Sequence, residues 1–117
     1  MTLKNFSLII SKPIKNYNKS IFIDSDKSIS IRSFLIASIS EGISLVENPL
    51  ESEDVKSTLE VVKKLGIKIK KISSKKYKVY GKGLGSLKCK NNSSLNFGNS
   101  GTLARLLIGI LSTTPDI

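Results

Sequence analysis

The stretch ESEDVKSTLEVVKKLG most limits how this chain can fold, because it combines a helix start, an apolar stripe and a helix stop. Ser52 or Glu53 begins the helix, and Glu53 and Asp54 suit its positive N-terminal end. Gly66 is suited to end it. The apolar residues recur at helical spacing and form one stripe, at Val55, Leu59, Val62 and Leu65. This helix needs an apolar surface to pack against.

The residues that follow predict that surface. Apolar residues alternate with lysines in 67–72 and again in 76–80, a pattern typical of strands with one buried face. Ser73 and Ser74 lie between the two stretches, which predicts a hairpin. A capped helix that leads into a hairpin predicts a domain in which helices cover a sheet.

The rest of the chain adds shorter elements. Asp24-Ser25-Asp26 interrupts an apolar run, and a helical pattern begins at Lys27 or Ser28, with Gly42 suited to follow its end. Its predicted apolar face consists of Ile31, Leu35, Ile36 and Ile39. Further strands are predicted over 6–10, 20–23, 43–46 and 94–97, and a last helix over 102–111. The order β-α-β-α-β-β-β-α indicates an α/β or α+β fold.

Composition narrows the classes of function. The chain has 117 residues and a formal charge of +10, but its lysines are densest in 68–82, where alternation indicates a solvated strand face. A nucleic-acid-binding module stays open as an alternative, although only Tyr77 and Tyr80 interleave with those lysines. With no histidine and the single Cys89, a transition-metal site is disfavoured and a reducing compartment is expected. Neither a membrane span nor a signal peptide is recognisable, so we expect a cytoplasmic protein.

Two helix starts share the same chemistry. In NFGNSGTLARLL, Asn99 is the expected N-cap, and the small residues Ser100, Gly101 and Thr102 form the first turn. Backbone N–H groups there favour an anion, and Gly101 allows a ligand to approach closely. Arg105 follows within one turn. Ordinary capping explains part of this motif equally well.

The first helix repeats the arrangement. In DSDKSISIRS, Lys27 and Ser28 lie at the helix start, and Arg32 lies one turn after Ser28 on the same face. A lysine, a hydroxyl and an arginine at this spacing suit a phosphate or a carboxylate. The two arginines of this lysine-rich chain, Arg32 and Arg105, both lie in these motifs. Arginine is hard to replace where an anion is held by two parallel hydrogen bonds.

Three segments, DKSISIR, ENPLESEDVKSTLEVVKKLG and GNSGTLARLLIGIL, resemble in order and spacing the N-terminal quarter of the 5-enolpyruvylshikimate-3-phosphate synthase family. The resemblance runs from about Ile10 to the last residue. It implies a fold of two similar domains, each built from three βαβαββ units. Residues 1–22 would then belong partly to the second domain, and 23–117 would supply the first unit and part of the next. The chain is therefore expected to be a fragment, inactive by itself.

The resemblance also implies a reaction without a cofactor or metal. The enolpyruvyl group of phosphoenolpyruvate passes to the 5-hydroxyl of shikimate 3-phosphate, and phosphate is released. By position, Lys27 would be catalytic and contact both substrates, and Ser28 and Arg32 would bind shikimate 3-phosphate. Asn99 and Gly101 would bind phosphoenolpyruvate. The full-length enzyme is expected to be a monomer with its acid and base groups farther along the chain.

Some features of the motifs remain open. Thr102 and Arg105 are further candidates for substrate contacts. Ile31 stands where the family pattern usually has a polar residue, so it would remove a polar neighbour beside Arg32. A second enolpyruvyl transferase family, which acts on UDP-N-acetylglucosamine, has Lys-Asn where this chain has Lys27-Ser28, and it remains an alternative.

Overall fold

The computed structural model describes residues 20–90 and 92–115, together with 7, 9, 11–13, 16 and 18. Three helices and one sheet make up the described fold. The elements in chain order are α1 (Lys27–Ile39), β1 (Glu41–Glu47), α2 (Glu53–Lys64), β2 (Lys68–Ser73), β3 (Lys76–Lys82) and α3 (Gly101–Leu111). The mixture of helices and strands agrees with the predicted fold class.

The sheet is antiparallel and its strands lie in the order β1-β3-β2. The predicted hairpin is confirmed, with β2 pairing β3 from Lys68↔Tyr80 to Ser73↔Lys76. Its turn lies at Ser74 and Lys75, and Lys75 adopts a φ of 51°. On β3, Tyr77 and Val79 face the helices and are buried, whereas the alternate lysines face solvent. The strand pattern therefore identified the buried face of β3 correctly, whereas β2 is exposed along most of its length and its Ile72 is 48% exposed.

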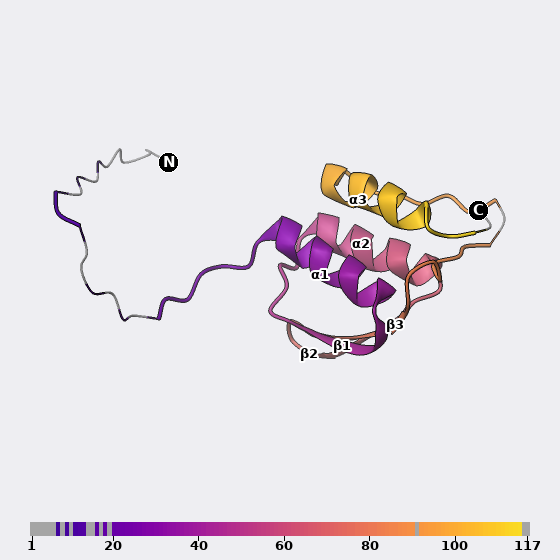
Figure 1. Ribbon diagram of the computed structural model, residues 1–117, viewed down its shortest axis with the longest axis horizontal. Coiled ribbons are helices and arrows are strands. Elements are labelled where there is room, and N and C mark those ends of the chain that lie inside the picture. Colours follow the sequence, from indigo (N-terminus) through magenta and orange to yellow (C-terminus); the bar gives the residue numbers. More distant parts are fainter. Residues whose placement is uncertain are drawn as a thin grey trace.

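The molecule is layered. Figure 1 shows α1 and α2 side by side on one face of the sheet, with α3 packed on the far side of these two helices. All three helices run in the same direction, so their N-terminal ends gather at one end of the layered region (Figure 1). Among the described residues, no helix is long and apolar enough to cross a membrane. The arrangement places three helix starts close together.

The core lies between the sheet and the helices and continues up to α3. Phe34 of α1 packs edge-on against Tyr77 of β3, with ring centroids 5.4 Å apart. Leu103 and Leu107 of α3 are fully buried against the same core. Each such side chain stabilises the fold by about 1.5–3 kcal/mol through burial. The position of α3, and hence of its N-terminus, is fixed by this packing.

The predicted apolar face of α1 is partly wrong. Ile31 and Leu35 are buried as expected, but Ile36 is 60% exposed and Phe34 takes its place in the core. The helix SISIRSFLIASI is apolar on nearly every side, so its sequence alone does not define which side is buried. Contacts with the sheet and α2 decide the face instead.

Two predicted strands do not form. Residues 20–23 pair with no strand among the described residues, and Phe22 is fully exposed at 103%. Residues 94–97 are also not a strand; Leu95 and Phe97 are half-buried against the core without a neighbouring ladder. An extended segment counts as a strand only when another strand satisfies its backbone groups. The predicted strand over 6–10 lies largely outside the described residues.

Candidate functional site

The candidate site lies where the three helices begin. Each start is closed by a side-chain oxygen that accepts a hydrogen bond from a backbone N–H three residues later. These bonds are Ile29 N to Asp26 Oδ1 (2.7 Å), Val55 N to Ser52 Oγ (3.4 Å) and Leu103 N to Ser100 Oγ (3.1 Å). A helix N-terminus carries about half a positive charge. Three of them at one end favour the binding of an anion.

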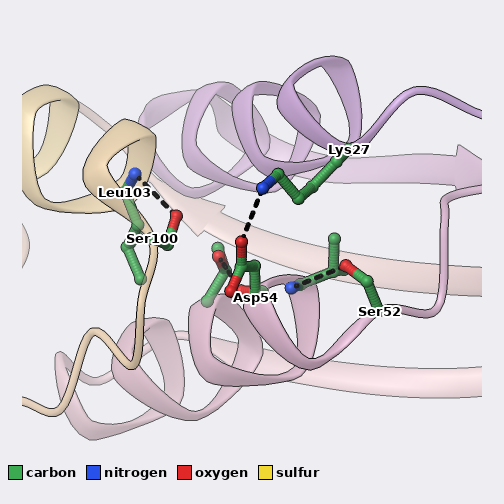
Figure 2. Close-up of polar contacts among 7 residues, drawn as sticks. Lys27, Ser52, Asp54, Ser100 and Leu103 are labelled. Carbon is green, nitrogen blue, oxygen red and sulfur yellow. Dashed lines mark hydrogen bonds and ion pairs between the residues drawn. The ribbon is translucent and has the colours of Figure 1, made fainter.

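Lys27 reaches from the start of α1 to the first turn of α2. Its Nζ atom lies 2.8 Å from Oδ2 of Asp54, and the two side chains are 49% and 16% exposed. Figure 2 shows the ammonium directed at Asp54, and the cap of α3 at Ser100 lies to the left of Asp54 in this view. The hydrogen bond to Asp54 and its negative charge raise the pKa of Lys27, although burial partly opposes them. Lys27 is therefore a protonated, held cation at neutral pH.

Ser28 and Arg32 lie one turn apart near the start of the same helix. Ser28 is half-buried and Arg32 is exposed, and Arg32 forms no ion pair within the described residues. Ile31, in contrast, is fully buried in the core next to Phe34 and Leu35. The effect of Ile31 on Arg32 stays a prediction, since the structure shows only that the Ile31 side chain packs inward.

The start of α3 corrects one residue of the predicted motif. Ser100, and not Asn99, is the N-cap, and Gly101 is the first helical residue. A turn at Gly98, where φ is +55°, brings the chain against Ser57 of α2 and shifts the helix start by one residue. Asn99 is exposed beside the cap. Ser100 itself is buried, and its Oγ atom accepts from the N–H group of Leu103.

Gly101 has open space around it. A methyl group built on Gly101 meets no atom within 4 Å, and its φ is not in the left-handed region. Neither packing nor backbone conformation among the described residues thus requires glycine here. Thr102 is half-buried, and Arg105 is exposed without an ion pair in the described part of the chain. The open space lies at the positive end of the helix.

Asp54 is the residue of this site that the sequence did not reveal. Its position in the first turn of α2 favoured a simple interpretation as a complement to the helix dipole. Its contact with Lys27 is tertiary and leaves no pattern in the spacing. The described residues contain no cluster of three or more histidine, cysteine or acidic side chains suited to hold a metal ion.

Comparisons with known proteins point to one family. The family model described as EPSP synthase (3-phosphoshikimate 1-carboxyvinyltransferase) matches residues 11–116. A 3-phosphoshikimate 1-carboxyvinyltransferase of Oenococcus oeni is 45% identical over 102 residues, which cover 87% of this chain and 23% of that protein. One of Petrotoga mobilis is 42% identical and is covered to the same extent, 23%. The chain thus spans about a quarter of the length of the curated relatives it matches.

Solved structures give the same result. EPSP synthase from Acinetobacter baumannii superposes with a TM-score of 0.71 at 36% identity, over 80% of this chain and 21% of that one. On the match of nearly the whole sequence and on the shared fold, the chain belongs to the EPSP synthase (3-phosphoshikimate 1-carboxyvinyltransferase) family.

Proposed function

We propose that this chain forms the N-terminal part of the substrate site of a 3-phosphoshikimate 1-carboxyvinyltransferase. In that reaction the 5-hydroxyl of shikimate 3-phosphate attacks C2 of phosphoenolpyruvate while C3 is protonated, and the tetrahedral intermediate then loses phosphate. Both substrates carry several negative charges, so the site must supply fixed positive charge. The proposal rests on the position of Lys27, whose Nζ atom lies 2.8 Å from Oδ2 of Asp54 beside the start of α3.

Shikimate 3-phosphate binds along the start of α1. Ser28 and Arg32 lie one helical turn apart on its surface, and Arg32 has no ion pair with another described residue. A guanidinium and a hydroxyl at this spacing suit the 3-phosphate, because arginine can donate two parallel hydrogen bonds to it. Lys27 lies between this surface and the start of α3 and contacts both substrates.

Phosphoenolpyruvate binds at the start of α3. Asn99 is exposed there, and Gly101 leaves open space in front of the free backbone N–H groups of the first turn. Thr102 and Arg105 are the next groups within reach of the same anion. The open space at Gly101 supports this assignment. Packing within the protein would allow a larger residue at this position, so the protein alone does not explain the glycine.

The remaining steps need parts of the two-domain fold that this chain does not cover. We assign no general acid or base to it and expect no turnover from the 117 residues by themselves. In this scheme residues 1–22 belong partly to the second domain and 23–117 to the first. We propose a cytoplasmic, monomeric enzyme, in line with the single cysteine and the small-molecule substrates.

A chimera tests the proposed function. Residues 11–116 would replace the matched segment of the full-length Oenococcus oeni relative, and phosphate release would be followed with both substrates. The parent chimera should turn over, and Lys27→Met should lose activity by more than a hundredfold, on the order of 3 kcal/mol. Lys56→Met is the matched control, because Lys56 also pairs with an acidic residue of α2 but lies exposed on its surface. Equal activity of the Lys27→Met chimera and the control would reject the proposal.

A further inference from the structure

The ion pair between Lys27 and Asp54 differs from the others in the described part of the chain. The carboxylates of Glu51, Glu53 and Glu47 in the other pairs are 36%, 87% and 60% exposed, whereas that of Asp54 is 16% exposed. An exposed pair is held weakly because water competes for both partners. Asp54 is shielded from that competition, so it can fix the ammonium of Lys27 in one place.

The helix beneath Asp54 fixes its carboxylate in turn. Ser52 caps α2, and Asp54 is the second residue of its first turn. The positive end of the helix favours a negative charge at this position. The Thr58 hydroxyl donates to the backbone carbonyl of Asp54 at 2.9 Å, and Thr58 is itself fully buried. The carboxylate is thus attached to a well-packed turn, while Lys27 has a long and flexible side chain.

Within the described part of the chain, the geometry leaves Lys27 with unused hydrogen-bond donors. A lysine ammonium has three N–H groups, and Asp54 accepts from one of them. About half of the Lys27 side chain stays exposed. Two donors therefore remain for groups outside the pair, which matches the number of anionic substrates in the proposed reaction.

We propose that Asp54 is a positioning residue: it holds the Lys27 ammonium between the two substrates and is not itself in contact with them. This inference rests on the proposed function. Asp54 adds a negative charge to an anion site, so it works against ground-state binding of the substrates. Its benefit is a fixed cation at the place where charge develops during the reaction.

The opposing effects predict an unusual kinetic pattern in the chimera described above. Asp54→Asn should lower kcat by tenfold or more, because the lysine is no longer fixed, and should leave both KM values unchanged or lower. Glu53→Gln is the matched control: it removes the same charge from the same helix turn, but its partner is the exposed Lys56. It should leave kcat within twofold. Asp54→Ser, which keeps a residue suited to a helix start, provides a second variant if Asp54→Asn folds poorly.

A double variant separates positioning from structural damage. If Asp54 acts through Lys27, Lys27→Met with Asp54→Asn should be no slower than Lys27→Met alone. Nuclear magnetic resonance of the Lys27 side chain in the 117-residue protein gives an independent reading, since the raised pKa of Lys27 should fall in Asp54→Asn and stay in Glu53→Gln.

Two results would overturn the inference in distinguishable ways. A loss of kcat in Asp54→Asn no larger than in Glu53→Gln, with Lys27→Met inactive, would remove the positioning role and leave the proposed function intact. Full turnover of Lys27→Met would contradict the proposed function, and the inference would fall with it.

Discussion

At the scale of single residues, the cations at the helix starts differ in how they are held. Lys27 is fixed by a shielded carboxylate, whereas Arg32 and Arg105 are exposed and lack ion pairs within the described residues. A fixed ammonium suits a group that stabilises developing charge, and free guanidinium groups suit a bound phosphate or carboxylate. This difference between Lys27 and the two arginines predicts that they respond differently to substitution.

Arg32→Lys should weaken binding of shikimate 3-phosphate more than binding of phosphoenolpyruvate. Lysine keeps the charge but cannot donate two parallel hydrogen bonds to the phosphate. Calorimetry on the chimera should give at least a tenfold weaker Kd for shikimate 3-phosphate. Equal losses for the two substrates would show that Arg32 contributes only general charge.

Gly101→Ala should separate ligand binding from stability. The added methyl group meets no protein atom within 4 Å, and alanine is the better helix former, so the free energy of unfolding should stay level or rise by up to about 1 kcal/mol. The methyl projects at the helix start where phosphoenolpyruvate is proposed to bind, so its KM should rise. Gly109→Ala, equally free of contacts within 4 Å, is the control for the same substitution away from the site. A KM that is unchanged relative to this control would make Gly101 an ordinary helix-start glycine.

At the scale of elements, the start of α3 depends on one hydroxyl. The Oγ atom of Ser100 is buried and accepts from the N–H group of Leu103, whereas the neighbouring Asn99 is exposed. Ser100→Ala should therefore lower the free energy of unfolding by about 1 kcal/mol. Asn99→Ala should leave it nearly unchanged. Urea denaturation of the two variants compares them directly. A larger loss of unfolding free energy in Asn99→Ala would identify Asn99 as the N-cap.

Elements whose signals are local could be predicted from the sequence. The helix over Glu53–Lys64 and the β2–β3 hairpin have caps or alternation within a few residues, and both form as expected. The predictions of strands over 20–23 and 94–97 were wrong because a strand depends on a partner strand that a local pattern does not specify. The cap of α3 moved from Asn99 to Ser100 because both residue types cap well and the turn at Gly98 decides between them.

The same distinction holds for the site. Lys27, Ser28 and Arg32 could be proposed from the sequence because they lie close together in one predicted helix, and the structure places all three in α1. Asp54 was missed because its contact with Lys27 joins residues 27 positions apart in the chain. The partner of a cation in a site is set by how helices pack, and no spacing rule contains that information.

At the scale of the whole molecule, titrating groups limit the pH range of stability. Hydrogen bonds to carboxylates raise the pKa values of Lys27, Lys56 and Lys71 above 10.5, and burial raises that of Tyr77 above 10.0. The folded state binds these protons more tightly than the unfolded state does. Their contribution is complete below the unfolded values and is lost as the pH rises through the folded ones.

Glu51 is expected to limit the stability of the fold at acidic pH. Hydrogen bonds from Lys71 and then from Tyr77 lower its pKa below 4.5, so its contribution is present above 4.5 and is lost as the pH falls through the lowered value. Urea midpoints should be level between these limits and decline outside them. Glu51→Gln should reduce the decline in acid, and Glu60→Gln, which lies exposed on α2, should not. Identical acid profiles for the two variants would show that Glu51, with its hydrogen bonds to Lys71 and Tyr77, does not cause the loss of stability in acid.

The central claim is that the common N-terminal end of the three helices binds the anionic substrates. The most direct measurement is a titration of the isotope-labelled 117-residue chain with shikimate 3-phosphate and then with phosphoenolpyruvate, followed by nuclear magnetic resonance. The claim predicts shifts of the backbone amide signals of Ser28, Gly101 and Thr102, and no shifts in the lysine-rich hairpin over 68–82. Lys27→Met should weaken the response and Lys56→Met should not. Shifts confined to the hairpin, or equal in both variants, would contradict it.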